Sequence, residues 1–139
     1  MPEITRTLET SLYVADLDRS EAFYRRLCGF TTLMRDERMC AMAVPNHHVL
    51  LLFRRGGSVH ASPSPVGDIP GHDGQGTQHL CFGIPADAYE EWARHLGQEN
   101  VEIESRLEWP KGGRSLYFRD PDGHSLEVAT SGLWDNDPL

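Results

Sequence analysis

The sequence lacks several features that would assign it to a class at once. It has no apolar run long enough to cross a bilayer, and Met1 to Arg6 lack the apolar stretch of a secretory signal. It has only three cysteines, Cys28, Cys40 and Cys81, and no CxxC spacing. A disulfide framework or a structural zinc site is therefore not expected, and the reducing cytoplasm is the predicted location.

The sequence also lacks an excess of basic residues. It has 13 Lys and Arg against 21 Asp and Glu, for a net charge of −8 and a pI near 5.3. Nucleic acid and anionic membrane both require a basic surface, so neither is expected as a partner. A small molecule is the expected partner instead.

What is present suits one compact domain of 139 residues, because 39% of them are apolar and 9% are aromatic. Residues 4–55 contain a strand pattern, a helix pattern and three further strand patterns, and residues 77–130 repeat this order. Residues 56–76 form a Gly- and Pro-rich linker, and residues 131–139 an irregular tail. The sequence therefore predicts an α+β fold of two βαβββ modules.

Local signals give the expected bounds of these elements. In the first module we expect a helix capped by Asp18 with Glu21 and ended by Gly29. In the second we expect a helix capped by Asp87 and ended by Gly97. The expected strands are 6–15, 30–36, 39–44, 48–54, 77–84, 101–104 with a continuation at 107–108, and the two strands around the turn at 120–123.

The last two strands carry an unusual residue. The turn Asp120-Pro-Asp-Gly123 joins them, and alternation places Leu126 and Val128 on one face and Glu127 on the other. A carboxylate in the middle of a strand is disfavoured and costly to bury without a partner. Glu127 therefore either faces solvent or holds something.

Two more residues that can bind metal lie on corresponding faces. Glu9 and His79 open the first strands of the two modules, on the face opposite the apolar one, as Glu127 does in the last strand. Two carboxylates and an imidazole suit a divalent ion such as Mn, Fe, Ni, Co or Zn, with the remaining positions open to water or substrate. Taken alone, a His or Glu in a strand more often has a structural or solvent-exposed role, and the joint placement of the three favours the metal site.

Three segments, Leu12–Phe30, His79–Phe82 and Leu116–Glu127, resemble the vicinal oxygen chelate superfamily. This superfamily includes glyoxalase I, extradiol dioxygenases, methylmalonyl-CoA epimerase, fosfomycin-resistance thiol transferases and bleomycin-resistance proteins. The resemblance implies curved mixed sheets around a metal cavity, with the helices on the outer face. It also implies a homodimer, and the linker is long enough to permit an exchange of modules between the chains.

The resemblance implies Glu9, His79 and Glu127 as metal ligands, with Glu127 or Glu9 as the catalytic base. The fourth-ligand position of glyoxalase I-like members falls near Leu51, which cannot bind metal. Fosfomycin thiol transferases and dioxygenases usually have His where this chain has Glu9. The predicted substrate-binding residues are Tyr117, Tyr13, Ser115 and Arg114.

The first hypothesis is a metal-dependent glyoxalase-like enzyme, a lyase or isomerase acting on a small oxygenated substrate. The second is a non-catalytic protein that sequesters a drug or metabolite, as bleomycin-resistance proteins do; those generally lack the metal triad. The third is an extradiol-type dioxygenase, which Glu9 disfavours because the usual iron triad has two His and one carboxylate.

Overall fold

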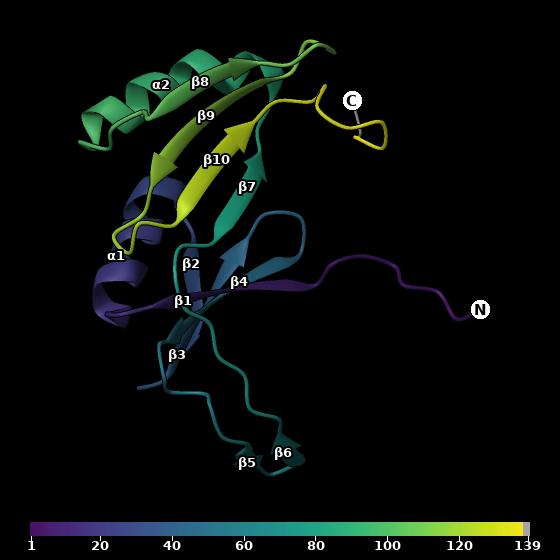
Figure 1. The fold of residues 1–139 in the computed structure, drawn as a ribbon, viewed down its shortest axis with the longest axis vertical. Helices are drawn as coiled ribbons and strands as arrows, with labels where there is room; N and C mark the ends of the chain where they lie inside the picture. Colours follow the sequence, from purple (N-terminus) through teal and green to yellow (C-terminus); the bar gives the residue numbers. More distant parts are fainter. Residues whose placement is uncertain (138–139) are drawn as a thin grey trace. The chain divides into compact units, whose positions relative to one another are not determined.

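A computed structural model describes residues 1–137 and divides the chain into two compact units. The first unit is Met1–Gly76, and the second begins at Thr77. Each contains a four-stranded mixed sheet and an α-helix (Figure 1). Within each sheet, the strand that comes first in the sequence pairs in parallel with the strand that comes last. The predicted α+β fold of two βαβββ modules is confirmed.

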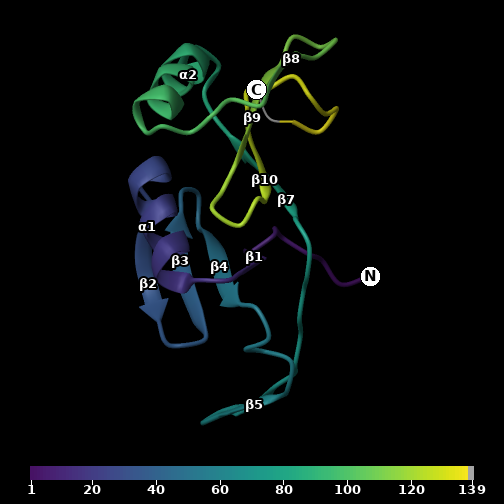
Figure 2. The ribbon, with the colours of Figure 1, turned by 60° about the vertical axis from the view of Figure 1, so that its left-hand side comes forward.

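The first unit has a sheet with a helix on one face. Helix α1 contacts β3 and β4, as can be followed in Figure 2. The sheet order is β1-β4-β3-β2. The elements are β1 (Glu9–Val14), α1 (Leu17–Cys28), β2 (Thr31–Arg35), β3 (Met39–Val44) and β4 (His48–Arg54). The apolar side chains on the helix side are fully or almost fully buried: Leu12, Val14, Phe23, Tyr24, Leu27, Cys40, Met42, Leu50 and Leu52.

The start of α1 differs from the prediction. Asp16, not Asp18, is the N-cap, and its carboxylate accepts a hydrogen bond of 3.1 Å from the backbone N–H of Arg19. Gly29 ends the helix as predicted, with a left-handed φ of 72°. Both aspartates could cap at this spacing. The long-range partner decided between them, because Asp18 binds Arg35 of β2 at 2.7 Å.

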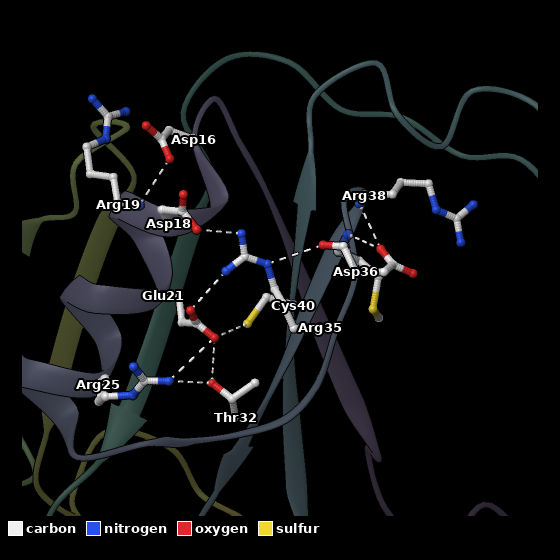
Figure 3. A network of polar contacts seen from close by, with 11 residues as sticks. Asp16, Asp18, Arg19, Glu21, Arg25, Thr32, Arg35, Asp36, Arg38 and Cys40 are labelled. Carbon is white, nitrogen blue, oxygen red and sulfur yellow. Dashed lines mark hydrogen bonds and ion pairs between the residues drawn. The ribbon is translucent and has the colours of Figure 1, made fainter.

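A polar network ties α1 to the sheet (Figure 3). One Glu21 carboxylate oxygen accepts from the Thr32 hydroxyl at 2.6 Å and from the Cys40 thiol at 3.3 Å. The other oxygen accepts from Arg35 at 2.9 Å. The pKa of Glu21 is lowered, chiefly by the hydrogen bond from Thr32. The Cys40 hydrogen bond and the positive charge of Arg35 lower it further, whereas burial of the carboxylate raises it.

The linker is more ordered than predicted. It contains a small antiparallel hairpin of β5 (Ser62–Ser64) and β6 (Gly67–Ile69). Gly67 has a φ of 133°, which is open to glycine at low cost and lets the chain reverse there. The sequence signal for a loop was its Gly and Pro content, which is equally typical of tight turns.

The second unit repeats the first. Its elements are β7 (His79–Gly83), the short 3₁₀ helix η1 (Ala86–Ala88), α2 (Tyr89–Gln98), β8 (Ser105–Glu108), β9 (Arg114–Arg119) and β10 (Ser125–Ala129), with sheet order β7-β10-β9-β8. Asp87 does not cap α2, because it lies inside η1. Gly97 does not end α2 either, because the helix continues to Gln98 and Glu99 is the C-cap.

The start of β8 differs from the predicted strand, whereas the last hairpin forms as predicted. No strand is formed over 101–104, because the N–H of Val101 closes the end of α2 on the carbonyl of Leu96. The turn at 120–123 forms as predicted, with the N–H of Gly123 bonded to the carbonyl of Asp120 at 3.0 Å. The Asp120 carboxylate accepts from the N–H groups of Asp122 and His124, which holds the register of β9 and β10.

No helix in the described part of the chain has the length and apolar character to cross a membrane. The tail was predicted to be irregular, and residues 131–137 form no helix or strand. Residues 138–139 lie outside the described part.

Candidate metal centre and ligand cavity

The central strand β10 places Glu127 between two neighbours. It pairs with Cys81 of β7 on one side and with Tyr117 of β9 on the other. Only 4% of the Glu127 surface is exposed, which excludes the solvent-facing alternative for this carboxylate. A buried carboxylate needs hydrogen bonds or an opposite charge.

A short relay orients the Glu127 carboxylate. The indole N–H of Trp109 donates to Ser115 Oγ at 2.8 Å. Since Trp is a donor only, Ser115 accepts there and directs its own proton to Glu127 Oε2, with which it forms a very short hydrogen bond. Ser115 was predicted as a substrate contact; in this unit it holds Glu127. The other carboxylate oxygen, Oε1, is left for another partner.

His79 lies against that second oxygen. Its Nε2 is 3.3 Å from Glu127 Oε1, and its Nδ1 is 2.8 Å from the backbone carbonyl of Ser125. The imidazole also stacks on Tyr117 with ring centroids 6.2 Å apart. The second unit therefore brings together His79, Glu127, Ser115 and Tyr117, as the alternation predicted.

The carboxylate influences both residues that pair with it. Burial, followed by the negative charge of Glu127, raises the pKa of Tyr117. The same causes raise the pKa of the Cys81 thiol to about 12, although the residue as a whole is exposed. Both groups therefore stay protonated near neutral pH, and Cys81 is not an activated nucleophile.

Arg114 lies apart from this group. Its guanidinium carbon is 3.9 Å from the ring centroid of Tyr89, and its Nη1 is 3.5 Å from Glu90 Oε1. Both partners belong to α2, so the side chain points to the helix side of the sheet, opposite to Ser115. This placement counts against the predicted substrate contact of Arg114, and alternation along β9 would have indicated it.

The first unit has a cavity on the sheet face that carries Glu9. The cavity has a volume of about 600 Å³, and Glu9 and Tyr13 both line it, as does Leu51. Register shows that Leu51 occupies in the first sheet the position of Glu127 in the second. Leu51 pairs with Ser11 as Glu127 pairs with Cys81. Glu9 likewise corresponds to His79, because each opens its strand.

The family model of the Glyoxalase/Bleomycin resistance protein/Dioxygenase superfamily matches residues 6–128. The chain belongs to this superfamily. The family resemblance of the sequence is thereby confirmed.

Individual relatives of this superfamily member include enzymes of two kinds. Metallothiol transferase FosB of Lysinibacillus sphaericus is 30% identical over 124 residues, covering 88% of this chain and 79% of the relative. FosB of Staphylococcus saprophyticus is 27% identical over 124 residues, covering 88% and 74%. The crystal structure of a lactoylglutathione lyase from Agrobacterium tumefaciens has a TM-score of 0.87 and 32% identity, covering 96% of this chain and 99% of that one.

The donor atoms of this superfamily member fit a divalent cation. Since a backbone carbonyl only accepts, the Nδ1 of His79 carries a proton, and the neutral ring has its lone pair on Nε2. That lone pair then faces a carboxylate oxygen at 3.3 Å, so two acceptors meet. A cation or a proton between them removes the repulsion. Within residues 1–137, no three His, Cys, Asp or Glu side chains lie close enough together to hold a metal ion. The second unit thus offers two donor atoms for such an ion, His79 Nε2 and Glu127 Oε1.

Several residues at the cavity were not singled out from the sequence. His72, unassigned in the linker, lies with its Nδ1 2.7 Å from the Tyr13 hydroxyl and its ring centroid 4.4 Å from that of Phe53. Arg38 and Ser58 line the cavity as well. No spacing rule connects these residues to β1, so only a His in a long loop could have served as a signal.

Proposed function

We propose that this protein is a metal-dependent enzyme of the glyoxalase type, a lyase or isomerase acting on a small substrate with vicinal oxygens. Glu9, His79 and Glu127 would hold one divalent ion, such as Mn, Fe, Ni, Co or Zn. The observation that carries the proposal is the 3.3 Å approach of His79 Nε2 to Glu127 Oε1, each held by a partner of its own. Membership of the superfamily and the relatives named as enzymes support it.

The chemistry divides between the ion and the protein. A divalent ion at these ligands would polarise a substrate carbonyl and acidify the adjacent C–H. Glu127, displaced from the ion when substrate binds, would take that proton on Oε1 and return it to the neighbouring carbon, because Ser115 occupies Oε2. Glu9, the other carboxylate of the set, is the alternative base. Tyr117 would donate its phenolic proton to a substrate oxygen, and the raised pKa keeps that proton in place.

Metal analysis combined with Glu127→Gln tests the proposal. Gln keeps the size of the side chain and can still accept from Ser115, but it removes the charge. We expect about one divalent ion per chain in the native protein and a large loss in the variant, with loss of S-lactoylglutathione formation from methylglyoxal and glutathione. Glu102→Gln, at a site outside these contacts, is the control. Native protein without stoichiometric metal would refute the proposal.

A second candidate is transfer of a thiol to a small substrate, because two of the similar proteins are named metallothiol transferases. Glu9 counts against it, since thiol transferases of this kind usually have His at that position. The two activities differ in product. Incubation with a thiol and fosfomycin, followed by mass spectrometry, gives an adduct only for the transferase.

Two other functions remain as alternatives. A sequestering protein would bind its ligand equally well after Glu127→Gln and would need no metal. An extradiol dioxygenase would consume oxygen with catechols after iron loading. Assembly as a homodimer and location in the cytoplasm are further parts of the proposal, as is a small molecule as substrate.

A further inference from the structure

The first sheet has a second apolar face, opposite the one that α1, the helix of the same unit, packs against. On the face opposite α1, Met39, Ala41 and Phe53 are buried together, with Tyr13, Val49 and Leu51 packed against them. Such a face needs a cover, because its exposure to water costs about 25 cal/mol per Å² of apolar surface. The cover of the cavity includes the linker residues Ser58, Ile69, Pro70 and His72.

The hollow itself comes from small side chains in one row of the sheet. Leu51 pairs with Ser11 on one side and with Ala41 on the other. The next row pairs Phe53 with Tyr13 and Met39, which are large. The row of small residues therefore leaves the space above Leu51 empty. A cavity of about 600 Å³ over an apolar floor is of the size that holds a small organic ligand.

The two ends of this cavity differ, because Arg38 is the one cation among the lining residues and lies at one end only. Glu9 lies four residues before Tyr13 in β1, a separation of about 13 Å along a strand. Arg38 lies at the Tyr13 end, directly before Met39. Among residues 1–137 its guanidinium has no carboxylate partner and donates to the Ser62 hydroxyl. Asp36, also at that end, engages its Oδ1 with the backbone N–H groups of Arg38 and Met39 at 2.8 and 2.9 Å.

The Ser58 hydroxyl at the cavity is buried without a hydrogen-bond partner in the described part of the chain. Ser58 has 4% of its surface exposed. An unsatisfied buried hydroxyl is destabilising, and a ligand oxygen would remove that cost. The linker also fixes Tyr13, through its hydrogen bond to His72, as the end wall.

We infer that this cavity binds a molecule with an aromatic or branched aliphatic body and a carboxylate, which pairs with Arg38 while the body lies over Leu51 and Phe53. A guanidinium binds a carboxylate through two parallel hydrogen bonds, which an amide does not reproduce. The binding stands on the first unit alone. The further step, that the carboxylate marks the substrate end remote from the reacting oxygens, rests on the proposed function.

Binding to EDTA-treated protein, measured by calorimetry, tests the inference with three probes. These are 4-ethylbenzoate, its neutral isostere 4-ethylbenzamide, and acetate, which has the carboxylate without the body. We expect 4-ethylbenzoate to bind at least about tenfold more tightly than either. Equal binding of the amide, or no saturable binding of 4-ethylbenzoate, would overturn the inference.

Two pairs of variants locate the binding. Arg38→Gln should remove the preference for the carboxylate over the amide, whereas Arg106→Gln on exposed β8 should keep it. Ser11→Phe should fill the hollow and abolish binding, whereas Ser105→Phe on β8 should not. Unchanged binding in Ser11→Phe or Arg38→Gln would place the ligand elsewhere and refute the inference. Circular dichroism confirms that each variant is folded.

The outcomes separate this inference from the proposed function. Metal-free protein that binds 4-ethylbenzoate but takes up no divalent ion would support the cavity and refute the enzyme. Protein with stoichiometric metal and no affinity for 4-ethylbenzoate would do the reverse.

Discussion

Equivalent strand positions carry Leu51 in the first unit and Glu127 in the second. The register makes this equivalence firm, since each pairs with the third residue of the first strand of its unit. An apolar side chain at one position leaves a hollow floor, and a carboxylate at the other creates a polar cluster with His79. The same repeated framework therefore carries an apolar surface in the first unit and a polar cluster in the second.

The Ser115 hydroxyl should be essential to the buried carboxylate. Ser115→Ala leaves Glu127 Oε2 without this donor and the Trp109 N–H without an acceptor. We expect a loss of about 1–3 kcal/mol in the free energy of unfolding, measured by urea denaturation in EDTA. Ser105→Ala, on exposed β8, should change stability little. Equal stabilities for the two variants would contradict the relay.

Glu21 should make stability depend on acid pH. Its pKa is lowered in the fold, first by the Thr32 hydrogen bond, from an ordinary value of 4.5. The stabilisation is thus fully present above 4.5 and is lost as pH falls through the lower folded pKa. Glu21→Gln should cost about 1–3 kcal/mol at pH 7, and the difference from the native protein should shrink below 4.5. Denaturation series at several pH values, with the exposed Glu37→Gln as control, measure this.

At the scale of elements, alternation and turn signals predicted the strands well. The last hairpin and the four strands of the first sheet form where the sequence placed them. Helix starts were less predictable, because Asp16 and Asp18 are both competent caps and a contact with Arg35 decided between them. The predicted strand at 101–104 does not form, because the N–H of Val101 is hydrogen-bonded to the carbonyl of Leu96 at the end of α2.

Two glycines in the second unit should respond in opposite directions to alanine. A Cβ on Gly113 would lie 2.8 Å from the backbone carbon of Gly132 and 2.5 Å from Leu133, so backbone has to move. We expect Gly113→Ala to cost about 1–3 kcal/mol. Gly97 lies in α2 with ordinary φ and nothing within 4 Å, so Gly97→Ala should stabilise by about 0.5–1 kcal/mol.

Thermal and chemical denaturation of the two variants measures whether each substitution lowers or raises the free energy of unfolding. Each serves as the control for the other, because the substitution is identical and only the surroundings differ. A stabilising Gly113→Ala would mean that the loop before β9 does not approach the tail closely.

At the scale of the whole molecule, the expected homodimer can be tested by complementation. In the proposed metal site, the second unit would supply His79 and Glu127, and the first would supply Glu9. If the site is completed across two chains, mixing Glu9→Gln with Glu127→Gln subunits restores one intact site in each mixed dimer. After unfolding and refolding together, we expect about a quarter of the native metal capacity. Each variant alone, refolded in the same way, is the control, and no recovery would place the site within one chain.

The sequence by itself determined the repeated order of elements and the faces of Glu9, His79 and Glu127. These follow from a period of two along a strand, which is local and needs no knowledge of distant residues. Only the tertiary structure decided that Arg38, Ser58 and His72 meet Tyr13 and Leu51 at one cavity. Those residues lie far apart in the chain. Packing of the linker over the second apolar face of the first sheet brings them together, and no local pattern encodes that packing.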